Sequence, residues 1–366
     1  MRLTVVTLRH PYRYFLSHHV EYLERTGAAK VDVHLLDGEG AVTQRRRSLG
    51  FMARGGLGLL RILARSRGEV LLTGHPTVGL LMSGLRLLGI RQGLWIHWFT
   101  GQVWAGRQDL RARVLRHLDR HLAAQADIVL VDSWPQLKFL RSAGFADCRT
   151  LGVVGWGSIC GVDGRLLEVN RPIPSRGQLV LGYVGRVSWE KGIMDLVHWF
   201  VSYSSDRNVR LLVFGALDDE AIKAEFLAEV ERSCGKIEYR GVVSDLPELY
   251  RQFDVLVNPS YREGFCGAIA EAQAAGLPVI ARDIYGVQSS LLPGVSGGFF
   301  TAIAEVGPWL EELALDPARW LEMKRQARRF AATRFARETV VAQIAHEYAR
   351  AARLWRRGPA AADAEV

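Results

Sequence analysis

Short apolar runs alternate with amphipathic segments from the first residues of the chain onward. The run RLTVVTL is apolar and β-branched, as in a buried parallel strand, and HHVEYLERTG has the spacing of an amphipathic helix that ends at Gly27. The same reasoning predicts strands at 31–37, 69–74, 93–99 and 126–133, and helices at 77–89 and 135–143. This order is typical of a doubly wound parallel sheet.

The second half of the chain repeats this pattern. It predicts strands at 179–187, 209–215, 236–241, 254–260 and 278–283, each followed by a segment compatible with a helix. Between the halves, VNRPIPSRGQ breaks both periodicities with prolines, a glycine and polar residues, as a linker does. The α/β pattern therefore predicts an N-terminal Rossmann-like domain over 1–168, a linker over 169–178, a C-terminal Rossmann-like domain over 179–335, a helix over 336–357 that packs back toward the N-terminal domain, and a disordered tail over 358–366.

Composition agrees with two folded domains and adds a charge preference. The chain has 366 residues, more than one hydrophobic core usually covers, and 49% of them are hydrophobic. The formal net charge of +9 favours an anionic partner: nucleic acid, an acidic membrane surface or a phosphorylated substrate. Four cysteines without a C-x-x-C pair are typical of reduced thiols, and the apolar runs are too short for a signal peptide or a membrane span. These features predict a cytoplasmic protein.

A stretch over 45–68 mixes arginines with Leu, Ile, Phe and Met at partly helical spacing. It can lie on an anionic membrane surface, or it can be a helix that packs on the domain and exposes a basic rim. Together with the arginines at 107, 111, 113 and 116, this stretch would also suit a lipid diphosphate at a cytoplasmic membrane surface, whereas the arginines at 107, 111 and 113 can equally form a solvated helix face. The sequence leaves both open.

The segment GYVGRVSWEKG places Arg186 and Lys191 after a predicted strand, where open α/β sheets bind ligands. Gly185 allows close approach of a backbone, and the two cations can flank a diphosphate. An ordinary surface turn has similar residues, so this segment alone is a weak signal. It lacks the G-x-G-x-x-G pattern of dinucleotide-binding dehydrogenases.

The segment YREGFCGAIAEAQAAG places two carboxylates around the start of a predicted helix. Glu263 lies in the loop before the helix, and Glu271 lies eight positions later on it. The backbone N–H groups of Gly264 and Phe265 and the helix N-terminus suit a phosphate or a polar sugar, and carboxylates accept hydrogen bonds from polyols. In a purely structural interpretation, Glu263 is a helix-end charge and Glu271 is a solvated helix residue.

The motif EGFCGAIAE (263–271), preceded by NPSYR and followed by AGLPVIA, resembles the signature of family 4 retaining glycosyltransferases. GRVSWEKG and DIYGVQSSLLPGVSGG look like the phosphate turn and the nucleotide-domain loop of the same family. IHWFTGQVWAGR (96–107) and VGWGSICGVD (154–163) are similar to segments of bacterial members that extend lipid-linked saccharides for surface polysaccharides. The chain departs from many members because TLRHPYRYFLSHH has no Gly-Gly pair after the first strand.

This resemblance implies the GT-B fold, in which two Rossmann-like domains face each other across a cleft. It assigns the donor diphosphate to Arg186 and Lys191, the ribose hydroxyls to Glu271, and the donor sugar hydroxyls to Glu263. It also brings His97 toward the donor sugar, although a buried core histidine is the common alternative. The full donor-binding set that it implies is Gly185, Arg186, Lys191, Glu263, Gly264, Phe265, Cys266, Gly267 and Glu271. Cys266 can simply pack there, or it can be mildly activated as a thiol.

The implied activity is transfer of a sugar, with retention, from a nucleoside diphosphate donor, a UDP-sugar in the common case, to a saccharide acceptor that is lipid-linked. No cofactor beyond the nucleotide-sugar co-substrate is expected. No metal site is expected either, and the acidic run at Asp218 is interpreted as a surface turn. The expected location is cytoplasmic, with contact at the inner face of the cytoplasmic membrane as an option.

Other classes remain as alternatives. A GT-B sugar-nucleotide epimerase binds the same kind of donor without an acceptor. A basic nucleic-acid-binding protein would use the positive charge, but no helix-turn-helix, zinc-finger or aromatic RNA-binding motif is found. A two-domain ligand receptor of the periplasmic type would need a secretion signal.

Overall fold

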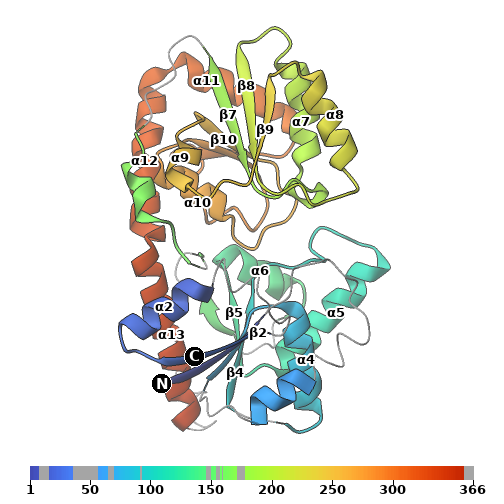
Figure 1. Cartoon of the computed structure of the whole chain (residues 1–366), viewed down its shortest axis with the longest axis vertical. Helices are drawn as coiled ribbons and strands as arrows, with labels where there is room; N and C mark the ends of the chain where they lie inside the picture. Colours follow the sequence, from blue (N-terminus) through green and yellow to red (C-terminus); the bar gives the residue numbers. More distant parts are fainter. Residues whose placement is uncertain are drawn as a thin grey trace. The chain divides into compact units, whose positions relative to one another are not determined.

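The computed structural model describes residues 1–7, 16–35, 57–64, 70–90, 93–145, 150–153, 157–158, 160–170 and 178–357. The chain divides into two compact units (Figure 1). Met1–Cys160 and Glu338–Val366 form the first unit, and Gly161–Arg337 form the second. Each unit contains a parallel sheet, so the predicted α/β class with two Rossmann-like domains is confirmed.

In the described part of the first unit, six parallel strands lie in the order β2-β1-β3-β4-β5-β6. They are β1 (Arg2–Thr7), β2 (Lys30–Leu35), β3 (Val70–Thr73), β4 (Leu94–Phe99), β5 (Ile128–Val131) and β6 (Thr150–Val153). Every residue of β3, β4 and β5 is buried, whereas the edge strand β2 is partly exposed. Central strands of a parallel sheet are covered on both faces, which explains why they read as continuous apolar runs.

Helices cover both faces of this first sheet. On one face, α2 (Ser17–Arg25) and α13 (Arg337–Arg357) bury Leu23 and Tyr348 beside strand residues such as Trp98. The other face is covered by α4 (Pro76–Leu87), α5 (Leu110–Gln125), α6 (Trp134–Ser142) and a helix over 57–64. The C-terminal helix therefore belongs to the core of the first unit, although 177 residues of the second unit precede it in the chain.

The second unit repeats this architecture with a different strand order. Its described strands lie in the order β12-β11-β10-β7-β8-β9 and are all parallel. They are β7 (Leu179–Val184), β8 (Val209–Phe214), β9 (Ile237–Gly241), β10 (Val255–Asn258), β11 (Val279–Arg282) and β12 (Gly297–Phe300). The helices are α7 (Ile193–Tyr203), α8 (Lys223–Arg232), α9 (Leu246–Tyr250), α10 (Gly267–Ala274), α11 (Val306–Leu315) and α12 (Pro317–Phe335), with short 3₁₀ turns η2 (Gly164–Glu168), η3 (Trp189–Lys191) and η4 (Ile303–Glu305).

Strand β7 is the point at which the strand order of the second sheet reverses. It pairs with β8 on one side and with β10 on the other, so the chain builds outward in both directions from this pair. In open α/β sheets, ligands bind outside the carboxyl ends of the strands at such a switch point. The loops after β7 and β10 are therefore placed together where a ligand site is expected.

The unit boundaries differ from those that the sequence pattern predicts. Residues 161–168 belong to the second unit, because Val162 donates its N–H to the Phe335 carbonyl at 2.7 Å and Leu166 is buried in the core of that unit. Residues 171–177 of the expected linker and the expected tail over 358–366 lie outside the described residues. No helix within the described ranges is both long enough and apolar enough to cross a membrane.

The arginine-rich stretch over 45–68 is described only from 57 to 64. That part is a helix, and its Leu59 and Leu63 are buried in the core of the first unit. For this part of the stretch, the packing interpretation is correct. The remaining residues of the stretch lie outside the described ranges.

Candidate active site

Hydrogen bonds with the Tyr183 side chain and with strand β8 hold the backbone of the loop after β7 in place. The Tyr183 hydroxyl donates to the Arg186 carbonyl at 2.6 Å, and the Gly185 N–H donates to the Phe214 carbonyl of β8 at 3.0 Å. The loop then forms the 3₁₀ turn η3 and reaches Gly192, whose φ of +65° favours glycine. A Cβ at Gly192 would collide with the Pro259 carbonyl oxygen, so the loops after β7 and β10 lie in direct backbone contact.

An ion pair joins these two loops. Lys191 Nζ lies 2.6 Å from Glu263 Oε1, although 72 residues separate the two in sequence. The side chains of Lys191 and Glu263 are only 19% and 11% exposed, and the Ser260 hydroxyl donates to the same Glu263 oxygen at 2.8 Å. Burial by itself would lower the pKa of Lys191, but the Glu263 carboxylate raises it overall. Lys191 is therefore a fixed positive charge at the carboxyl end of β7.

A second charge cluster lies on the same loops. Glu190 accepts hydrogen bonds from both Arg186 and Arg262, and its own carbonyl accepts from the Tyr261 N–H at 3.0 Å. Burial would raise the pKa of Glu190, but the charges of Arg186 and Arg262 lower it below its usual range. The Arg186 side chain is 48% exposed and so remains accessible to a ligand.

Three cations and two carboxylates lie together on these loops. Arg186 and Arg262 pair with Glu190, and Lys191 pairs with Glu263. Cations clustered at the carboxyl edge of a sheet suit an anion such as a diphosphate.

Glu271 lies on α10 and makes contacts separate from those of Glu263. The Tyr250 hydroxyl donates to Glu271 Oε2 at 2.7 Å, which fixes the orientation of the carboxyl group. Burial raises the pKa of Glu271, while the hydrogen bond from Tyr250 and the charge of Arg337 oppose this shift. Tyr250 itself is fully buried on α9.

The residues between the two glutamates serve packing as well as the site. The Phe265 ring packs edge-on against Phe335, with ring centroids 5.3 Å apart. Cys266 is buried, accepts a hydrogen bond from Asn258 Nδ2 at 3.2 Å, and burial raises the pKa of its thiol. Cys266 is therefore a packed thiol in this structure rather than a thiolate. At Gly267, the first residue of α10, a Cβ would meet no protein atom within 4 Å, so the helix start is open.

The loops at this edge of the sheet lie in a segment that is similar to a known protein family. Residues 178–314 match the family described as Glycosyl transferases group 1. The matched segment, the group 1 domain, lies within the second unit. Arg186, Lys191, Glu263 and Glu271 all lie within this group 1 domain.

A relative and two solved structures extend the comparison. Capsular polysaccharide biosynthesis glycosyltransferase CapM of Staphylococcus aureus is 31% identical over 194 residues, which cover 49% of this chain and 50% of CapM. The match thus spans half the length of that relative. The structure is similar to sucrose-phosphate synthase from Thermosynechococcus elongatus (TM-score 0.79, 18% identity, 96% of this chain and 98% of that one). It is also similar to Anabaena HepE in complex with UDP-glucose (TM-score 0.74, 17% identity, 96% and 100%). At these identities the likeness establishes the fold, which is GT-B.

The structure corrects the expectation for His97, which lies outside the group 1 domain. His97 is the fourth residue of the six in β4, not a residue at the strand end, and it is fully buried. Its Nδ1 lies 2.8 Å from the Thr73 hydroxyl, and a Cβ at Gly79 of α4 would collide with its ring. Burial, followed by the charge of His75, lowers the pKa of His97 to about 3. His97 is therefore a neutral core histidine in this structure, inaccessible to a sugar.

The acidic run that begins at Asp218 has a structural contact to the site loop. Asp219 Oδ2 accepts a hydrogen bond from the Trp189 N–H of η3 at 3.0 Å. The described residues contain no group of three or more His, Cys, Asp or Glu side chains arranged to hold a metal ion.

Sequence reasoning missed four residues that shape this site. These are Glu190, Arg262 and Ser260, which contact the predicted residues, and Tyr250, which orients Glu271. The first three lie inside the motifs WEKG and PSYREG, so their closeness in sequence to the predicted residues could have identified them. Tyr250 lies outside every motif, and only the packing of α9 in the core of the second unit brings it to Glu271.

Proposed function

We propose that this protein is a retaining glycosyltransferase that transfers a sugar from a nucleoside diphosphate donor, a UDP-sugar, to a saccharide acceptor. One observation carries the proposal: Lys191 is held 2.6 Å from Glu263 at the switch point of a group 1 glycosyltransferase domain. This pair places a fixed cation beside a fixed hydrogen-bond acceptor for hydroxyl groups.

The reaction explains why cations and carboxylates are needed together. When the nucleoside diphosphate leaves, negative charge develops on the diphosphate and positive character develops on the sugar ring. Arg186 and Lys191 would stabilise the diphosphate, since preorganised charges lower the barrier without reorganising during the reaction. The proposal assigns this charge neutralisation to the two side chains and not to a metal ion.

The carboxylates would position the donor. Glu263, held by Lys191 and Ser260, would accept hydrogen bonds from hydroxyls of the donor sugar. Glu271, oriented by Tyr250 through one oxygen, would accept from the ribose hydroxyls through the other. The open helix start at Gly267 leaves room for the diphosphate near the α10 N-terminus.

Retention, the choice of nucleotide and the type of acceptor are each supported by a separate similarity. The resemblance to family 4 supports retention, with the acceptor hydroxyl attacking the face from which the diphosphate departs and a departing phosphate oxygen taking its proton. The HepE complex contains UDP-glucose, which supports UDP as the nucleotide. The capsular polysaccharide role of CapM supports a saccharide acceptor in surface polysaccharide synthesis, and the resemblance supports a lipid-linked acceptor used at the inner face of the cytoplasmic membrane.

A thermal-shift titration tests the donor site. Wild type and Glu271→Gln would be titrated with UDP, GDP, ADP, their sugar conjugates and NAD, with Glu231→Gln on α8 as the control. A ligand at about 100 times its dissociation constant adds about 2.7 kcal/mol of stability, which such an assay resolves. We expect UDP and a UDP-sugar to stabilise the wild type and the control, and Glu271→Gln to lose most of this effect.

Two results would count against the proposal. Stabilisation by NAD, with none by any nucleoside diphosphate, would remove the glycosyltransferase assignment. An altered sugar nucleotide formed without any acceptor would indicate an epimerase. The anomeric configuration of the product, read by NMR, tests retention separately.

A further inference from the structure

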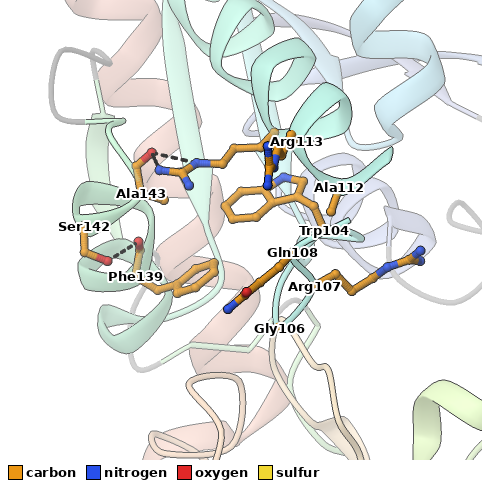
Figure 2. A pocket seen from close by; sticks show the side chains of 10 residues that line it. Trp104, Gly106, Arg107, Gln108, Ala112, Arg113, Phe139, Ser142 and Ala143 are labelled. Carbon is orange, nitrogen blue, oxygen red and sulfur yellow. Dashed lines mark hydrogen bonds between the residues drawn. The ribbon is translucent and has the colours of Figure 1, made fainter. Parts of the chain in front are cut away.

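The first unit has a pocket that the donor site does not explain. It has a volume of about 540 Å³, within the usual range for small-molecule sites. It lies between the loop after β4, the first half of α5 and the end of α6 (Figure 2). All of its lining residues belong to the first unit, and none belongs to the group 1 domain.

The polar lining of this pocket is basic. Arg107, Arg113 and Arg116 line it, and no Asp or Glu does. Arg107 is neutralised by Asp109, with Nε 2.8 Å from the carboxylate. Within the described ranges, Arg113 and Arg116 form no ion pair, so these two guanidinium groups supply uncompensated positive charge. Such a lining favours an anion over a neutral ligand.

One of these guanidinium groups is held rigidly. Arg116 donates from Nε and Nη2 to the Ala143 carbonyl at 3.1 and 2.6 Å, and its Cζ lies 5.8 Å from the centroid of the Trp104 ring. A carbonyl leaves the full positive charge of the guanidinium in place, whereas a carboxylate would neutralise it. Preorganised arginine suits phosphate, because less side-chain entropy is lost when the ligand binds.

Another part of the lining is aromatic. The Trp104 ring stacks on Phe139 with centroids 5.3 Å apart and planes at 22°. Trp104 Nε1 donates a hydrogen bond to Asp119 Oδ2 at 2.8 Å, which fixes the orientation of the indole ring. Burial raises the pKa of Asp119 to about 6. Figure 2 shows the Trp104 and Phe139 side chains and the Gln108 amide directed toward the same space. An apolar or ring-shaped group can lie against these rings while an anionic group contacts the arginines.

We propose that this pocket binds the phosphate or diphosphate group of a ligand whose adjoining carbon skeleton lies against Trp104 and Phe139. Arg113 and Arg116 contact the phosphate oxygens, and Gln108 provides an amide donor. The identity of this ligand as the phosphorylated acceptor of the transfer reaction rests on the proposed function. The phosphate-binding property does not.

Matched charge reversals on α5 test the site. Arg113→Glu changes a pocket residue, and Arg111→Glu changes an exposed arginine two positions away that does not line the pocket. Both variants change the net charge equally, so a difference between them reports the local site. Isothermal titration of the full chain would use phenyl phosphate and inorganic phosphate, and flotation would use phosphatidylcholine vesicles with and without phosphatidic acid.

We expect Arg113→Glu to weaken phenyl phosphate binding by at least about tenfold and Arg111→Glu to leave it nearly unchanged. Arg113→Lys should fall between, since it keeps the charge and loses the planar fork. Phenyl phosphate should bind more tightly than inorganic phosphate because of the aromatic wall. If only the vesicle arm depends on Arg113, the phosphate belongs to a lipid headgroup; if the soluble arm does, it belongs to a free ester.

Equal losses in the two charge reversals would overturn the proposal, because they would indicate general electrostatic attraction. So would a loss of phenyl phosphate binding on Arg186→Ala, which would assign the anion to the group 1 domain. UDP stabilisation should be unaffected in Arg113→Glu. A variant that binds UDP but not phenyl phosphate therefore separates this inference from the proposed donor site.

Discussion

Replacing Lys191 by Met tests whether its ion pair with Glu263 holds the loops after β7 and β10 together. The two side chains are 19% and 11% exposed, so Lys191→Met leaves a largely buried carboxylate without its cation. Loss of one partner of such a pair costs about 3 kcal/mol. For a unit of this size, that corresponds to about 6–12 °C in the midpoint of thermal unfolding.

Differential scanning calorimetry is the suitable assay, because the two units can unfold in separate transitions. The double variant Lys191→Met with Glu263→Gln should recover about 2 kcal/mol relative to the sum of the single changes. Lys223→Met is the matched control, since the Lys223–Glu220 pair is 3.0 Å long but its side chains are 43% and 78% exposed. The control should change stability by less than about 0.5 kcal/mol.

Two results would refute this reasoning. If Lys191→Met shifts the midpoint no more than Lys223→Met, the ion pair does not hold the loops. If the single changes add without coupling, Lys191 and Glu263 act independently in solution. Either outcome would also remove the observation that carries the proposed function.

Two further predictions concern the buried acid Asp132 and Gly192, a glycine at positive φ. Burial raises the pKa of Asp132 to about 8, against the hydrogen bond from Trp98, so its stabilising contribution is full below about pH 3.9 and is lost as pH rises through 8. Asp132→Asn should therefore match the wild type near pH 4 and unfold at a higher temperature than the wild type at pH 9, as measured by calorimetry. Gly192→Ala puts a Cβ against the Pro259 carbonyl at a φ of +65°, at a cost of about 1–2 kcal/mol for the backbone alone, and should weaken UDP binding in titrations. Gly235→Ala, also at positive φ but with open space around its Cβ, should leave UDP binding unchanged.

The positions of most strands in the sequence were predictable, because parallel strands buried on both faces need continuous apolar runs. Strands β6 and β12 were not predicted; the β12 sequence GGFF is short and begins with two glycines. The structure explains the first of them: a Cβ at Gly297 would collide with the Val279 carbonyl oxygen of the neighbouring strand. Contact with a neighbouring strand is not visible in local sequence.

The candidate site was predictable only as separate motifs. The residue types of WEKG and REGF pointed to an anion and a polyol, and the sequence placed both motifs after strands. It could not determine that Lys191 contacts Glu263, 72 residues away, because that contact depends on the pairing of β7 with β10. The expectation for His97 failed for a related reason: its apolar context is the same for a strand end and a strand centre, and packing of α4 decides its burial.

The sequence by itself therefore determined the α/β class, the two repeated cycles of strands and helices, and the chemical types of the site residues. These follow from local periodicity and from residues close in sequence. Only the tertiary structure decided which carboxylate neutralises which cation, that the last helix completes the first unit, and that arginines and aromatic rings of α5, α6 and the loop after β4 enclose a pocket. These depend on strand order and helix packing, which bring together residues that local sequence treats as independent.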